Sequence, residues 1–226
     1  MEKDIAICIQ VRTRSERLKN KCFRKIKNKF LLEYCYKRLI KIEPSIPAYI
    51  LTSNLKSDDK IAKFCKKNKI NLFRGDHDDV LNRYTSFIKK TNIKNIIRGT
   101  SDNIFTDIVQ AKKLIKNHIN NKNDYSSNHY SYLPKGMGID IFKASTLLKL
   151  NKMNLNKSAR EHINMFFLKN KRKFKIFLKK GKNKNKINLS IDTNKDLQFI
   201  KKNFENLKKI NSYSELKKIL SNINHV

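Results

Sequence analysis

Short apolar runs alternate with helical patterns along this chain, and this alternation constrains its fold more than any other feature. Apolar runs of strand length occupy residues 5–11, 48–51, 71–73 and 95–98. Helical signals follow them at residues 30–39, 58–65, 78–79 and 108–115. Strands that alternate with helices predict an α/β fold, here a three-layer α/β/α sandwich around a Rossmann-like, mostly parallel sheet.

The second half of the chain adds a different pattern. Residues 124–142 are rich in Tyr, Ser and Gly and predict a strand pair. A helix is expected at 159–167, strands at 174–178 and 187–191, and two amphipathic helices at 195–204 and 214–220. Neither a repeat nor a linker interrupts the sequence, so residues 1–226 are expected to form a single domain.

The chain is strongly basic, with a formal net charge of +33. Such a charge attracts anions, among them nucleic acid, anionic lipid and nucleotides. The lysines are spread through nearly every segment and no nucleic-acid motif is present, so nucleic acid is an unfavoured partner. A basic nucleic-acid-binding protein nevertheless stays as the main rival hypothesis from another functional class.

Cysteine usage and hydropathy favour a cytoplasmic protein. The four cysteines have no CxxC spacing, so neither a zinc site nor a disulfide framework is expected. No apolar run reaches the length of a membrane span, and residues 5–11 read as a buried strand and not as a signal peptide.

Polar residues at the ends of strands are the candidates for a site, because ligands of open α/β sheets bind beyond the carboxyl ends of the strands. The loop at residues 12–21 holds three arginines and two lysines. These cations could clamp a triphosphate, although a solvated basic loop is an equally good interpretation of the pattern.

Asp102 and Asp192 each follow a predicted strand. Two carboxylates at strand ends could share Mg²⁺, which binds a few carboxylates together with phosphate oxygens. The residue pattern alone favours helix capping instead, especially for Asp192 before Thr193.

Six segments taken in order resemble the cytidylyltransferases of the spore-coat polysaccharide F type, relatives of the Kdo and acylneuraminate cytidylyltransferases. Residues 9–21 are similar to the family's Ile-Gln-Ala-Arg-x-x-Ser-x-Arg-Leu-Pro-Gly-Lys, and residues 73–84 to Phe-Arg-Gly-x-x-x-Asp-Val-Leu-x-Arg-Tyr. The other matching segments are residues 98–102, 134–142, 160–162 and 191–197. The resemblance covers nearly the whole chain.

The chain departs from the family pattern at several positions. Lys19-Asn20 replaces Pro-Gly, Arg14 replaces Gly, and Asn103-Ile104 replaces Cys-Pro. Asp140 stands for Glu, and Gly138 for an aspartate that is common two residues earlier. These departures concern the shape of the first loop and the choice of acceptor.

The resemblance implies a fold of the nucleotide-diphospho-sugar transferase type and a Mg²⁺-dependent transfer of CMP from CTP to an acidic sugar or phosphonate-like acid, with release of pyrophosphate, for surface polysaccharide or glycoconjugate synthesis. Arg12 and Lys21 would hold the phosphates, Arg17 would support the pyrophosphate, and Asp102 and Asp192 would bind the metal. The implied catalytic residues are Lys21, Arg12 and Asp102.

Further roles follow from the same resemblance. The other implied nucleotide-binding residues are Gln10, Val11, Thr13, Thr52, Ser53, Arg74, Arg98 and Ser101. The implied acceptor-binding residues are Tyr132, Lys135, Asp140, Arg160, Glu161 and His162, with Tyr125 and Tyr130 as further candidates. For His162 a helix start bonded to backbone is a competing interpretation, and His77 and His118 are expected on the surface.

Relatives of this kind are often dimers built through the middle strand pair, so a homodimer is expected, with residues 124–180 forming the acceptor-side and dimerisation region. Two rival functional hypotheses assume the same fold. One is a catalytically degenerate nucleotide-binding module. The other is a glycosyltransferase, whose metal-binding Asp-x-Asp pattern residues 76–78 match.

Overall fold

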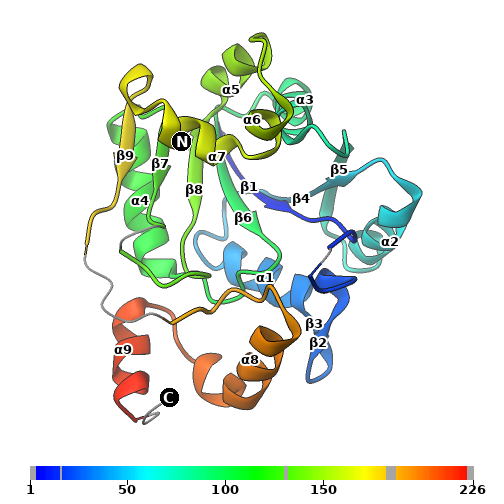
Figure 1. The fold of residues 1–226 in the computed structure, drawn as a ribbon, viewed down its shortest axis with the longest axis vertical. Helices are drawn as coiled ribbons and strands as arrows, with labels where there is room; N and C mark the ends of the chain where they lie inside the picture. The colour runs from blue at the N-terminus through cyan, green and yellow to red at the C-terminus, as the bar shows by residue number, and fades with distance from the viewer. Residues whose placement is uncertain (1–3, 16, 130–131, 182–186, 223–226) are drawn as a thin grey trace.

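The computed structural model describes residues 4–15, 17–129, 132–181 and 187–222, and within them a seven-stranded sheet runs through the molecule (Figure 1). The strand order is β5 (Asn71–Gly75), β4 (Ala48–Ser53), β1 (Ile5–Gln10), β6 (Asn95–Thr100), β8 (Asp140–Lys143), β7 (Tyr125–Ser127) and β9 (Ile176–Leu178). Strand β8 runs antiparallel to β6 and β7, whereas all the other neighbours pair in parallel.

Strand β1 is buried on both faces, as its unbroken apolar run predicts. Ile5, Ile7 and Ile9 pack into one hydrophobic core, and Ala6 and Cys8 into the other. The helices of the first core are α1 (Leu31–Ile40), α2 (Asp59–Lys67), α4 (Ile108–Asn120), α8 (Asn194–Leu207) and α9 (Tyr213–Asn222). Those of the second are α3 (Val80–Thr91), α5 (Ala144–Asn151) and α7 (Ile163–Lys169). The three-layer, mostly parallel sandwich is therefore confirmed.

The predicted strand pair within residues 124–142 is present as β7 and β8. The strand predicted at 187–191 is wrong, because this segment makes only an isolated bridge between Asn188 and Lys135. The Asn188 side chain accepts a hydrogen bond from Ser190 N at 3.0 Å, so a local turn uses a donor that a ladder would need.

The helix predicted at 159–167 is two helices, α6 (Lys157–Glu161) and α7. They meet at His162, which has φ −107° and ψ 64° and lies outside the helical region. A small hairpin of β2 (Lys25–Ile26) and β3 (Lys29–Phe30) was not predicted from the sequence pattern. Short 3₁₀ helices cover η2 (Lys21–Phe23), η3 (Lys56–Asp58) and η4 (Lys171–Lys173).

Helices α8 and α9 lie side by side at one end of the molecule (Figure 1). Of the helices in the described ranges, none combines the length and the apolar character that crossing a bilayer would require.

Candidate active site

A cavity of about 1070 Å³ opens where β1 and β6 end. Residues of the first loop, of the exit from β6 and of α6 line it, together with Asp192. Those among them that the sequence had singled out are Gln10, Arg12, Thr13, Arg17, Lys21, Ser101, Asp102, Glu161 and Asp192. The carboxyl ends of the parallel strands thus hold the site, as expected for an open α/β sheet.

The first loop is held in place by the buried carboxylate of Asp58. Thr13 donates to Asp58 Oδ1 from its backbone N at 2.8 Å and from its Oγ1 at 2.7 Å. Thr52 and Ser53 donate their hydroxyl groups to Asp58 Oδ2 at 3.0 and 2.5 Å. Burial alone raises the pKa of Asp58, but the hydrogen bonds from Ser53 and Thr13 outweigh it and lower that pKa overall.

This network corrects several nucleotide-binding predictions. Thr52 and Ser53 are fully buried, and their hydroxyl groups donate to Asp58. They therefore shape the loop and do not face the cavity. The backbone N of Val11 donates to Leu51 O within the sheet, and the backbone N of Thr13 donates to Asp58. Neither amide is therefore available to a nucleobase.

Lys21 joins the two predicted metal ligands. Its Nζ lies 2.8 Å from Asp102 Oδ2 and 3.1 Å from Asp192 Oδ1. Because one nitrogen bonds both carboxylates, the two aspartates converge on the same point. Burial lowers the pKa of Lys21, but the two carboxylates outweigh it and raise that pKa overall.

Asp192 forms ion pairs with two further basic side chains. Arg17 Nη2 lies 3.2 Å from its Oδ1, and Lys135 Nζ lies 2.6 Å from its Oδ2. Burial raises the pKa of Asp192, but the hydrogen bonds from Lys135 and Lys21 bring it down to about 2, so the group is ionised at neutral pH. Helix capping does not explain Asp192, because Thr193 is the N-cap of α8.

Asp102 and Asp192 fit a hard divalent cation. Asp102 Oδ1 is buried and has no hydrogen-bond partner among the described residues, so one carboxylate oxygen is left for a ligand. The described residues contain no cluster of three or more His, Cys, Asp or Glu that could hold a metal alone. A divalent cation bound here would therefore need further oxygen ligands from water or from a bound substrate.

Arg98 and Asp140 bind each other across neighbouring strands, and this corrects the acceptor-binding prediction for Asp140. Arg98 Nη1 lies 2.9 Å from Asp140 Oδ2, and Tyr125 OH donates to Asp140 Oδ1 at 2.6 Å. The Asp140 carboxylate is buried, so an acceptor cannot reach it. Arg98 also donates from Nε to Gln10 Oε1 at 3.2 Å, and Gln10 is the member of this chain of contacts that lines the cavity.

Two other basic residues serve the scaffold, contrary to their predicted roles. Arg74 donates to the carbonyl oxygens of Ser53 and Leu55. Arg160 donates to Asp79, the N-cap of α3, and to Asn151.

The remaining acceptor-side predictions have different outcomes. Glu161 lines the cavity and pairs with Arg12 at 3.3 Å. His162 is exposed at the junction of α6 and α7, does not line the cavity and accepts through its backbone, which fits the helix-start interpretation. Tyr132 packs against the first core, and Tyr130 lies outside the described residues.

Sequence reasoning missed three residues of this region. The sequence pattern predicts Asp58 at a helix start, His77 at the surface and no role for Lys157, yet His77 and Lys157 line the cavity. A carboxylate six residues beyond a strand-ending Thr52 was the only signal for Asp58, and it also suits a helix cap.

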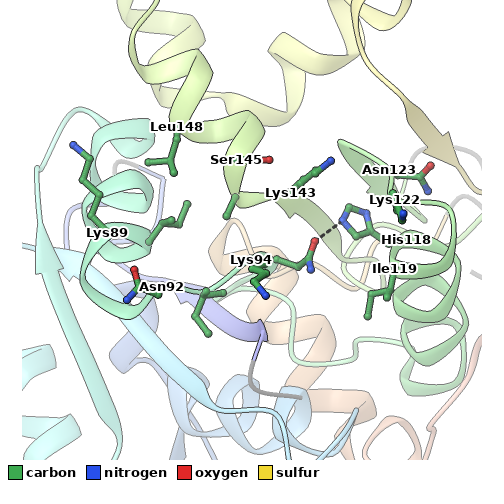
Figure 2. Close-up of a pocket in the computed structure, with 14 residues that line it drawn as sticks. Lys89, Asn92, Lys94, His118, Ile119, Lys122, Asn123, Lys143, Ser145 and Leu148 are labelled. Carbon is green, nitrogen blue, oxygen red and sulfur yellow. Dashed lines mark hydrogen bonds between the residues drawn. The ribbon is translucent and has the colours of Figure 1, made fainter. Parts of the chain in front are cut away.

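A second cavity of about 600 Å³ lies between the ends of α3 and α4 and the start of α5, beside the first residue of β6 (Figure 2). His118 lines it and is buried, so its predicted surface position is wrong. The ring bonds Ser126 Oγ at 2.8 Å and Asn95 Oδ1 at 3.3 Å. None of the described residues that line this cavity is a carboxylate, so the pair of aspartates distinguishes the first cavity as the candidate active site.

Comparison with known proteins identifies the family of this chain. The model of the cytidylyltransferase family matches residues 6–222. The chain belongs to the cytidylyltransferase family. This cytidylyltransferase is 33% identical over 193 residues to the uncharacterized protein MJ1063 of Methanocaldococcus jannaschii, across 84% of this chain and 79% of that protein. It is 26% identical over 206 residues to the spore coat polysaccharide biosynthesis protein SpsF of Bacillus subtilis, across 88% and 85% of the two chains.

Solved structures agree with this assignment. A cytidylyltransferase from Leptospira borgpetersenii superposes with a TM-score of 0.88 at 28% identity, covering 97% of this chain and 94% of that one. A CMP:2-keto-3-deoxy-manno-octonic acid synthetase complexed with CTP superposes with a TM-score of 0.66 at 11% identity, covering 89% and 98%, and shows the shared fold. The resemblance to the spore-coat polysaccharide F type and the predicted fold class are both confirmed.

Proposed function

We propose that this cytidylyltransferase transfers CMP from CTP to an acidic sugar, or to a related acid such as a phosphonate, and releases pyrophosphate. The observation that carries the proposal is the convergence of Asp102 and Asp192 on Lys21 beside a cationic loop. The names of two similar proteins support the acceptor class, since one acts in spore-coat polysaccharide biosynthesis and the other is a CMP-sugar-acid synthetase complexed with CTP. A surface polysaccharide or glycoconjugate is accordingly the proposed destination of the product.

The residues of the cavity suit nucleotidyl transfer. Arg12, Arg17 and Lys21 present cations to the triphosphate, and the charge that develops as pyrophosphate leaves is stabilised by groups already in place. Asp102 and Asp192 would hold Mg²⁺, which supplies further neutralisation of phosphate charge. The acceptor oxygen attacks the α-phosphorus in line, and the bond to pyrophosphate breaks. No covalent intermediate on the protein is needed.

Besides Arg12, Arg17 and Lys21, the predicted nucleotide-binding residues that line the cavity without a correction are Gln10 and Ser101. Arg98 can only donate, so the Gln10 atom that faces it is the amide oxygen, and the Gln10 NH₂ is left as the donor for a ligand. Lys135 and Glu161 are the acceptor-side candidates that touch the cavity residues Asp192 and Arg12. A homodimer remains a prediction.

The direct test is pyrophosphate release with Mg²⁺, each of the four nucleoside triphosphates in turn, and a panel of sugar acids and phosphonates. We expect release with CTP and one class of acid, and much slower release with the other nucleotides. Asp102→Asn serves as the inactive control in the same assay. Failure of CTP to bind, or release that does not depend on any acid, would contradict the proposal.

A further inference from the structure

The point on which Asp102 and Asp192 converge is taken by the ammonium group of Lys21. The Nζ atom is within hydrogen-bond distance of one oxygen of each carboxylate, at 2.8 and 3.1 Å. The side chain of Lys21 is only 14% exposed, so the ammonium group sits inside the site and not at its mouth. An ammonium group and a metal ion cannot both bridge these two oxygens.

The charges around the point also oppose a free cation. Two carboxylates face three cations, since Arg17 and Lys135 bind Asp192 in addition to Lys21. Asp102 Oδ1 has no hydrogen-bond partner among the described residues, but a divalent ion that bridges the two oxygens bound by Lys21 must displace the ammonium group and enter a site with a surplus of positive charge. A triphosphate changes this balance, because it gives Lys21 and Arg17 a polyanion to bind in place of the carboxylates.

We infer that Lys21 is a tethered competitor for the metal position, so that the protein alone holds a divalent ion weakly and takes it up together with the nucleotide. This inference rests on the proposed function for the identity of the nucleotide, and it assigns Lys21 two successive partners. Without nucleotide its ammonium group pairs with Asp102 and Asp192. With nucleotide it pairs with phosphate oxygens and releases Asp102 Oδ2 and Asp192 Oδ1. Since such coupling is reciprocal, the metal strengthens nucleotide binding by the same factor.

The test uses Mn²⁺ alone as the probe and follows free Mn²⁺ by electron paramagnetic resonance without nucleotide. Lys21→Met should bind one Mn²⁺ at least tenfold more tightly than the wild-type protein. Adding Asp102→Asn to that variant should abolish the gain. If Lys21→Met does not fold, as judged by circular dichroism, Lys21→Gln carries the same test.

Lys135→Met is the matched control. It removes the same charge from Asp192, which Lys135 bonds at 2.6 Å, but Lys135 makes no bond to Asp102. A gain in Lys135→Met equal to that in Lys21→Met would show that charge alone matters and would overturn the inference, as would an unchanged Mn²⁺ affinity in Lys21→Met. The Mn²⁺ measurement does not depend on turnover. A negative result in the pyrophosphate-release assay would therefore contradict the proposed function without affecting the interpretation of the Mn²⁺ affinities.

Discussion

Thr13 and Asp58, which are 45 positions apart, are joined by two hydrogen bonds to a single carboxylate oxygen. One bond comes from the backbone N of Thr13 and the other from its hydroxyl group. The first loop carries Arg12 and leads to Lys21, so its shape depends on an anchor that belongs to the turn after β4. The anchor is buried, and its carboxylate stays ionised because several donors surround it.

Asp58→Asn should therefore disturb both stability and the site. The amide keeps the shape of the carboxylate but offers an NH₂ group to Ser53, Thr52 or Thr13, which already donate. We expect a loss of about 1–3 kcal/mol in the free energy of unfolding, the range for a buried donor or acceptor that is left without a partner. Urea unfolding measures it, and weaker CTP binding should accompany it. Asp59→Asn is the control, because Asp59 is 45% exposed and its pair with Arg74 is at the surface.

Gly136→Ala should destabilise the loop that carries Lys135. Gly136 has φ +94°, which an L residue rarely adopts, and a Cβ there would lie 2.4 Å from Ser190 N. Strain of this kind costs on the order of 1–3 kcal/mol, and the backbone contact adds to it because neither segment can move aside easily. Thermal unfolding should show the lower midpoint. An unchanged midpoint would mean that residues 134–137 are not pinned to 188–190.

The fold could be predicted because the hydropathy pattern that specifies its strands and helices is local in the sequence. Strands such as β1 are apolar on both faces, and helices follow them at close intervals, so the sandwich could be read from periodicity. Two of the differences from the predicted fold lie at residues 187–191 and at the junction of α6 and α7. Asn188 takes the donor of Ser190, and His162 leaves the helical region, and neither event has a signal in hydropathy.

The candidate site was predictable only in part. Lys21, Asp102 and Asp192 lie in segments that match the family in register, and the structure brings them together, while their catalytic roles stay predictions. The resemblance implied ligand roles for Asp140 and Arg98, but a matched motif does not show which partner a charged side chain has. Only the register of β6 against β8, which no local pattern specifies, reveals that the two residues neutralise each other.

Asp102→Asn and Asp192→Asn should each lower kcat by at least about a hundredfold, since electrostatic stabilisation of the reacting phosphate is commonly worth that much per group. Steady-state pyrophosphate release measures the loss, and circular dichroism should show an intact fold. Asp78→Asn is the matched control: its carboxylate lies on the same cavity but is 66% exposed. Near-normal rates in both site variants would contradict the metal assignment.

His118 should make the stability of the protein depend on pH. Burial lowers its pKa to about 4, whereas the pKa of an imidazole in the unfolded chain is about 6.5. The unfolded state therefore binds a proton first as the pH falls, so this contribution to stability is complete above about pH 6.5 and declines progressively toward pH 4. Over that window His118 should account for roughly 1–3 kcal/mol of the loss.

Urea unfolding at pH 7.5 and pH 5 measures this difference in stability. His118→Gln should reduce the difference, even if the variant is less stable at both pH values. His162→Gln, at an exposed position, should keep the wild-type difference, and the same outcome in His118→Gln would assign the pH dependence to other groups.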